Sequence, residues 1–64
     1  MNAAETDTVV ETSDANYLKA GSDGYIAVFW YDRGALVVRP WCRGWDVPIE
    51  TLRARVVAAI GVLR

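Results

Sequence analysis

The chain has 64 residues, enough for one small domain, and chains of this size bury only about 60% of the surface that they expose when unfolded. Its composition is 53% hydrophobic and its mean hydropathy is +0.12, so it is too apolar for a disordered chain. The longest apolar runs, 25–31 and 56–63, are far shorter than the roughly 20 residues that span a bilayer. The sequence therefore predicts a soluble globular protein with no membrane association.

Charge is unevenly distributed along the chain. The net charge is −1, which is too small to attract nucleic acid or an anionic membrane over a distance. Residues 1–24 carry five acidic residues and one lysine, whereas residues 25–64 carry six arginines and three acidic residues. We expect residues 1–15 to form an acidic, mobile leader and residues 16–64 to form the single domain. Within the leader, the β-branched run 8–12 could pair with a free sheet edge.

Cysteine usage and the first residues indicate a cytoplasmic protein. Cys42 is the only cysteine, so it cannot form an intramolecular disulfide. The start of the chain has neither the basic nor the apolar region of a secretory signal. The excess of Arg over Lys, with many Ala, Val and Gly, is typical of GC-rich coding and suggests a bacterial or phage origin.

The clearest expected element is a β-hairpin with strands at 25–31 and 35–42, and a further short strand is expected at 16–20, before the turn residues 21–24. The three residues 32–34 suit a loop that places Tyr31 opposite Ala35. In this register one face carries no charge and should face the core: Ile26, Val28, Trp30, Leu36, Val38, Pro40 and Cys42. The other face holds most of the aromatic surface: Tyr25, Ala27, Phe29, Tyr31, Ala35, Val37, Arg39 and Trp41.

A helix is predicted from residue 47 to residue 60 or beyond. Asp46 precedes its first turn, Pro48 lies inside that turn, and Glu50 lies near the positive end of the helix dipole. Gly61 either ends the helix or lies within it. One stripe is apolar and should pack on the charge-free sheet face: Ile49, Leu52, Val56, Ala59, Ile60 and Leu63. We therefore expect an α+β fold, a hairpin or three-stranded meander with one C-terminal helix on one face.

No motif in the sequence indicates catalysis, a cofactor or a metal site. The chain has no histidine, so the usual general base is missing and Cys42 has no imidazole to deprotonate it. We interpret Cys42 as a small buried hydrophobic residue. Asp46 and Glu50 are explained by capping and the helix dipole, and no glycine spacing matches a nucleotide-binding loop. The sequence predicts a non-enzymatic protein.

The amount of apolar surface predicts a partner. Very small domains usually rely on disulfides, a metal or association, and only association is open to this chain. One candidate interface is the aromatic sheet face with Tyr25, Phe29, Tyr31, Val37 and Trp41; the other is a strip of small residues on the back of the helix, Ala54, Ala58 and Gly61. A homodimer is favoured. The alternatives are a monomer whose N-terminal segment covers the aromatic face, and an obligate complex with another protein.

The segment 39–45 interleaves Arg39 and Arg43 with Trp41 and Trp45, and it has three interpretations. In the first, Trp45 packs as a lid under the strand-to-helix connection and the arginines are solvated. In the second, the segment is a protein-binding hot spot, since Trp and Arg are enriched in such sites. In the third, the indoles stack on unpaired bases while the guanidinium groups hold phosphates of single-stranded nucleic acid.

Two function hypotheses follow. The first is a small protein-interaction module that self-associates and acts as a regulator or inhibitor, binding another protein through the aromatic face or the segment 39–45. The second is a dimeric nucleic-acid-binding regulator, in which dimerisation gathers Arg33, Arg39, Arg43, Arg53 and Arg55. Added salt distinguishes the two, because only binding to nucleic acid weakens steeply as counterions are released.

Overall fold

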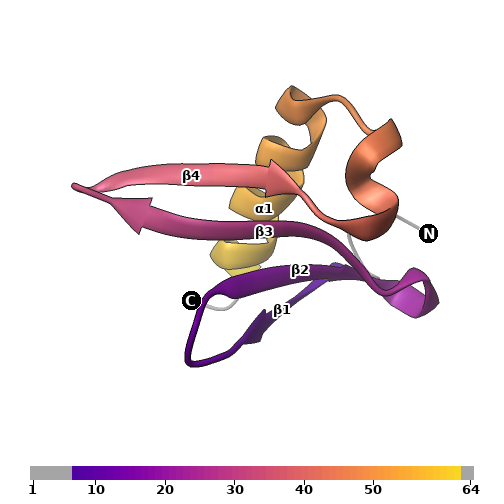
Figure 1. The fold of residues 1–64 in the computed structure, drawn as a ribbon, viewed down its shortest axis with the longest axis horizontal. Helices are drawn as coiled ribbons and strands as arrows, with labels where there is room; N and C mark the ends of the chain where they lie inside the picture. The colour runs from indigo at the N-terminus through magenta and orange to yellow at the C-terminus, as the bar shows by residue number, and fades with distance from the viewer. Residues whose placement is uncertain (1–6, 63–64) are drawn as a thin grey trace.

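A computed structural model describes residues 7–62 and shows a four-stranded antiparallel sheet followed by one α-helix (Figure 1). The strands are β1 (Asp7–Glu11), β2 (Asn16–Ala20), β3 (Tyr25–Asp32) and β4 (Ala35–Pro40), and the helix is α1 (Ile49–Val62). Two 3₁₀ helices, η2 (Gly21–Asp23) and η3 (Cys42–Asp46), connect β2 to β3 and β4 to α1. The predicted α+β class, the strand at 16–20 and the C-terminal helix are confirmed, and the sheet has one strand more than we expected.

The strands follow one another across the sheet in chain order, so β1 and β4 are its edges. Strand β1 pairs with β2 from Asp7↔Ala20 to Glu11↔Asn16. Residues 7–11 of the expected leader are therefore part of the sheet. Strand β1 widens the sheet at its edge instead of covering a face. Residues 1–6 lie outside the described residues. The β-branched residues in this run favour the extended conformation.

The side chain of Thr12 organises the turn between β1 and β2. Its hydroxyl donates to the Ala15 carbonyl at 2.7 Å and accepts from the Ala15 amide at 3.1 Å. The Thr12 amide also donates to the Ala15 carbonyl at 3.0 Å. Such local bonds between a hydroxyl and the backbone are typical of turns, and here they reverse the chain within four residues.

The turn between β3 and β4 is shorter than we predicted, which changes the register of the hairpin. Arg33 and Gly34 both have positive φ, 54° and 84°, as the two central residues of a type I′ turn require. Asp32 is therefore the last residue of β3 and pairs with Ala35, instead of belonging to a three-residue loop. Side chains alternate between the two faces of a strand. A difference of one residue in register therefore places the side chains of β3 on the other face relative to those of β4.

The predicted assignment of faces is consequently wrong for residues 27–31 of β3, whereas it is right for Tyr25, for the buried Ile26 and for much of β4. Phe29, expected on the outward aromatic face, is 2% exposed and lies in the core with Ala27. Val28 and Trp30, expected inside, pair with Arg39 and Val37 and do not belong to the core. Val38 is buried and Leu36 packs against the core, as predicted.

A bulge near the start of β3 adds a second correction. Leu18 pairs with Ala27 but Lys19 pairs with Tyr25, so Ile26 is the extra residue. This explains why two consecutive residues, Ile26 and Ala27, are both buried. It also places Tyr25 on the opposite face from Ala27, which simple alternation does not predict.

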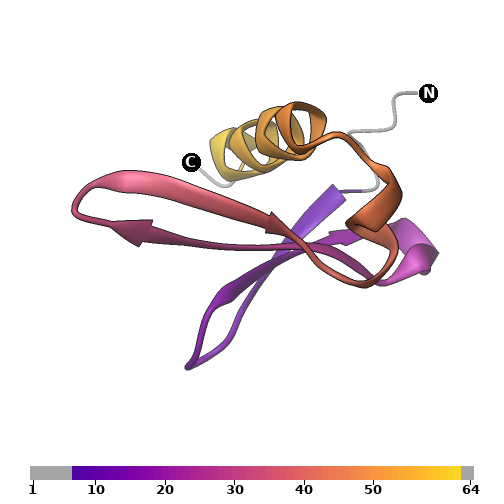
Figure 2. The same ribbon diagram turned by 45° about the horizontal axis from the view of Figure 1, so that its top comes forward.

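Helix α1 packs on one side of the sheet and forms the core with it (Figure 2). Leu52, Val56 and Ala59 are buried and Ile60 packs against them, but Ile49 is exposed, so the predicted stripe fails at its first position. The Pro48 carbonyl accepts the first helical bonds from the Thr51 and Leu52 amides, both at 3.0 Å. Pro48 thus precedes the helix, whereas we expected it inside the first turn. The helix continues through Gly61; Leu63 lies outside the described residues. No helix between residues 7 and 62 is long and apolar enough to cross a membrane.

The connection η3 packs its backbone directly against β3. The Trp41 amide donates to the Ile26 carbonyl at 2.9 Å, and Gly44 is buried beside the same carbonyl. A Cβ atom at Gly44 would lie 1.7 Å from the Ile26 oxygen. The chain leaves the sheet after Pro40, so Cys42 lies beyond the strand with φ 50° and is exposed; the prediction of a buried Cys42 is wrong.

Two arginines on α1 connect the helix to both edges of the sheet. Arg55 forms a bidentate ion pair with Asp7 on β1, with Nε–Oδ2 and Nη2–Oδ1 distances of 2.8 and 2.5 Å. The Asp7 side chain is 3% exposed, and its hydrogen bond raises the pKa of the Arg55 guanidinium. Arg53 donates from Nη1 to the Leu36 carbonyl on β4 at 2.8 Å. These contacts fix the edge strands against the helix.

The contact at Gly44 predicts unequal effects for two alanine substitutions. Gly44→Ala should lower the free energy of unfolding by at least about 2 kcal/mol, because the new methyl group meets backbone that cannot move aside. Gly61→Ala adds the same methyl group in a helix with nothing within 4 Å, and should raise stability by about 0.5–1 kcal/mol. Urea denaturation followed by circular dichroism measures both, and equal effects would contradict this packing of η3.

The ion pair at the sheet edge gives a second stability prediction. Asp7→Asn keeps the shape of the side chain but removes its charge, and should lower the free energy of unfolding by about 1–2 kcal/mol. Glu11→Gln, at the exposed other end of the same strand, is the matched control and should change it by less than about 0.5 kcal/mol. If both variants unfold at the wild-type urea concentration, β1 is not held by Arg55.

Candidate functional site

The sheet face opposite α1 is the main candidate for a functional surface. Among residues 7–62, α1 covers one side of the sheet and no helix or strand lies across the other (Figure 2). The uncovered side, called the open face below, carries the apolar residues Val10, Tyr17, Tyr25, Val28, Trp30 and Val37, with Trp41 beyond the end of β4. None of the seven belongs to the core beneath the helix or packs against it.

Three aromatic rings form a contiguous cluster at one end of the open face. The rings of Tyr17 and Tyr25 are stacked, with centroids 4.8 Å apart and planes 14° apart. The Trp41 ring meets Tyr17 edge-on at 5.6 Å. The bulge at Ile26 is what turns Tyr25 toward Tyr17, and the bond from the Trp41 amide to the Ile26 carbonyl positions the indole. Trp41 is 41% exposed, so the cluster is accessible to a partner.

Charges on the open face are separated toward its two ends. Lys19 pairs with Tyr25 and Arg39 pairs with Val28, so both cations lie near the aromatic cluster. Asp32 lies at the other end, beside the hairpin turn, and all three charged residues are exposed. Between these ends the face is apolar. Its chemistry suits apolar contact in the centre and ionic contact at either end.

The residues that we predicted as partner-binding do not form one surface. Tyr25, Val37, Arg39 and Trp41 lie together on the open face. Phe29 is in the core, so it cannot contact a partner without unfolding the domain. Arg43 and Trp45 lie on η3 and are exposed. Trp45 is 74% exposed, so the interpretation of this residue as a packed lid is wrong.

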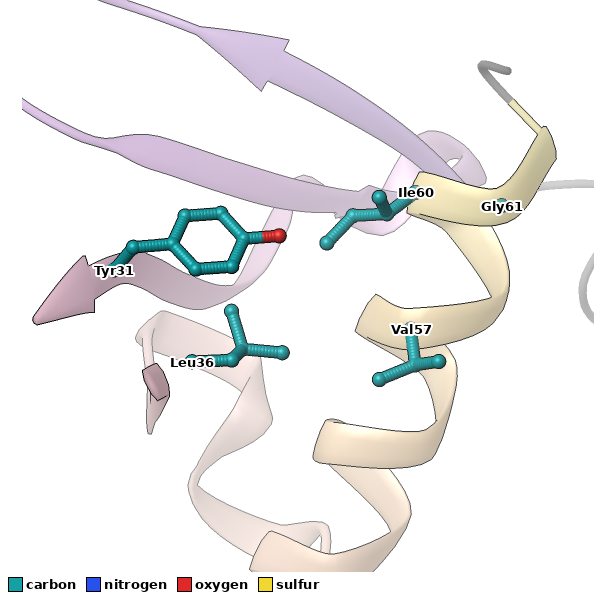
Figure 3. Close-up of a pocket in the computed structure, with 5 residues that line it drawn as sticks. All are labelled: Tyr31, Leu36, Val57, Ile60 and Gly61. Carbon is teal, nitrogen blue, oxygen red and sulfur yellow. The ribbon is translucent and has the colours of Figure 1, made fainter. Parts of the chain in front are cut away.

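Tyr31 lies on the helix side of the sheet, where it borders a shallow groove (Figure 3). The groove has a volume of about 240 Å³ and is lined by Tyr31, Leu36, Val57, Ile60 and Gly61. The predicted helix-back residues Ala54, Ala58 and Gly61 are all exposed, and of these only Gly61 reaches the groove. Tyr31 is the one aromatic residue that lines this groove.

The acidic residues and the single cysteine are the remaining candidates for chemistry. Between residues 7 and 62, no three His, Cys, Asp or Glu side chains gather closely enough to hold a metal ion. Asp46 ends η3 and Glu50 lies in the first turn of α1, both exposed, so the two acids flank the start of the helix. The exposed Cys42 has no histidine beside it, because the chain has none.

Sequence reasoning missed four residues of the open face: Val10, Tyr17, Val28 and Trp30. Gly34 was the residue that could have placed Val28 and Trp30 on the correct face. A glycine suits the second position of a two-residue turn as well as the end of a three-residue loop, and the two turns give different registers. Tyr17 and Val10 required the pairing of β1 with β2, which the β-branched run 8–12 allowed but did not specify.

Comparison with known proteins yields no matching family model, no similar curated protein and no similar solved structure. The function of the chain is therefore inferred from its own residues.

Proposed function

We propose that this chain is a non-enzymatic protein-interaction module that self-associates through its open face. The observation that supports this most directly is the aromatic cluster of Tyr17, Tyr25 and Trp41, which continues into the apolar centre of a face that no described element covers. Apolar surface of this kind on a soluble domain usually marks an interaction site. Trp and Tyr are also the residues that contribute most to protein interfaces.

A second copy is the partner that best fits the charge of the molecule. The net charge of −1 gives two copies little mutual repulsion, and it gives no long-range attraction for a strongly charged ligand. Packing two sheets face to face buries both open faces in a single step. Self-association also supplies the stabilisation that a small domain without disulfides usually needs.

In this proposal the module acts as a regulator or inhibitor through a second contact on the part of the segment 39–45 that lies in η3, with Arg43 and Trp45. Trp45 and Arg43 are exposed on η3, outside the strands of the sheet, so pairing of the open faces leaves them accessible to another protein. The single cysteine and the arginine-rich composition support a cytoplasmic location and a bacterial or phage origin.

Two adjacent aromatic residues on β3 test the interface, because they point to opposite faces. Trp30→Thr removes an indole from the open face and should weaken dimerisation at least about tenfold, as expected for an interface tryptophan. Tyr31→Thr removes an exposed ring from the helix side and should leave the dimerisation constant unchanged. Threonine preserves strand propensity at both sites. Sedimentation equilibrium measures the constant.

A chain that sediments as a monomer at every concentration tested would refute self-association. A dimer weakened by Tyr31→Thr but not by Trp30→Thr would move the interface to the helix side, toward the groove and the helix-back residues.

Single-stranded nucleic acid is a second candidate ligand, because Arg39 and Lys19 lie beside the aromatic cluster. Bases could stack on Tyr17, Tyr25 or Trp41 while the two cations hold phosphates. Only these two cations lie on the open face of the described sheet, and affinity for nucleic acid depends on the number of phosphates neutralised. The protein interface is therefore the first proposal.

Tryptophan fluorescence distinguishes these two candidates. Oligothymidine of about 15 nucleotides should leave the emission unchanged near physiological salt if the open face binds protein. Quenching that saturates, weakens steeply with added salt and is reduced by Arg39→Ala would instead establish the nucleic-acid function. The salt series itself is the control for nonspecific quenching.

A further inference from the structure

We infer that two copies pack open face to open face with their strands antiparallel, so that the acidic end of each copy faces the cationic end of the other. This inference rests on the proposed self-association and names the intermolecular ionic contact. The acidic end is Asp32, which Arg33 follows in the turn; the cationic end is Lys19, and Arg39 lies between that end and the centre, opposite Val28. A self-complementary surface with opposite charges at its two ends is what a two-fold interface requires.

The spacing of the charges along β3 fixes the position of the two-fold axis. Arg39 is opposite Val28, and Asp32 lies four residues beyond Val28 on the same strand. Four residues of extended chain span roughly 14 Å. A two-fold axis that lies between the two sheets, parallel to them and perpendicular to the strands, and that passes over β3 between Val28 and Trp30, exchanges these two ends between the copies. Asp32 then lies over the level of Lys19 and Tyr25 in the partner copy, next to Arg39.

The same axis brings apolar groups together in the centre. Trp30 of each copy falls at the level of Val28 and Tyr17 of the other, since Tyr17 pairs with Val28 across β2 and β3. Stacked sheets lie about 10 Å apart, a gap that an Asp side chain and an Arg or Lys side chain can bridge from opposite sides. The contacts of Asp32 with Lys19 therefore lie at the two ends, as in the polar rim of a protein interface, whereas Arg39, opposite Val28, lies beside the apolar centre.

The alternative orientation, with the strands of the two copies parallel, is unfavourable. It would gather both Asp32 carboxylates at one end of the interface and all the Lys19 and Arg39 side chains at the other. Like charges placed together across an interface select against that arrangement. The charges on the open face thus specify the direction of the partner as well as its identity as a second copy.

Charge exchange at the two ends tests the orientation. Asp32→Arg should weaken dimerisation about tenfold or more, because it places like charges face to face. Adding Arg39→Asp or Lys19→Asp to that variant should restore most of the lost affinity, whereas either substitution alone should weaken the dimer. Glu50→Arg, which makes the same change of charge on α1, is the control and should have no effect. Sedimentation equilibrium gives the constants, and circular dichroism confirms that each variant is folded.

The outcomes separate this inference from the function on which it rests. A dimer that depends on Trp30 but is not restored by either compensating substitution retains the open-face interface and refutes the antiparallel arrangement. A monomeric wild-type chain refutes both. Restoration by either substitution supports the inference, and the more effective one shows which cation Asp32 contacts.

Discussion

The structure depends on the two-residue turn at Arg33 and Gly34. Both residues adopt left-handed backbone conformations, and the turn makes Asp32 pair with Ala35. That register decides that Phe29 enters the core while Trp30 remains on the open face. A loop longer by one residue would shift the pairing, so that the Trp30 indole would face the core and the Phe29 ring would lie on the open face. The turn therefore determines which aromatic side chain of β3 enters the core and which lies on the open face.

What the sequence could predict follows from how local each signal is. The helix stripe of Leu52, Val56 and Ala59, the strand 16–20 and the fold class came from periodicity and turn residues within short windows. The orientation of the aromatic residues could not be obtained in this way, because it depends on one residue of turn length and on a bulge at Ile26. The position of Cys42 was missed because Pro40 ends β4 early. Periodicity can be recognised in a single strand, whereas the register of pairing depends on the residues of both strands and on the turn between them.

Burial is distributed unequally over the two sides of the sheet. One helix of 14 residues covers one side, and its contacts with β1 and β4 reach both edges. The opposite side carries a Tyr–Tyr–Trp cluster with no described element over it. Small domains rarely expose such a surface without a use for it, because it would otherwise promote aggregation. The proposed association through this face would also add stability to so short a chain.

The arginine contacts at the two edges also limit how this protein can assemble. Sheet edges offer unpaired backbone groups to which further strands can add, and repeated addition builds fibrils. Here the Leu36 carbonyl is occupied by Arg53, and the start of β1 is held by Arg55 through Asp7. A strand that adds to β4 would have to displace the Arg53 guanidinium before it could pair with the Leu36 carbonyl. Edge addition at β4 is thus disfavoured, which is compatible with the proposed closed pair in which sheets stack face to face.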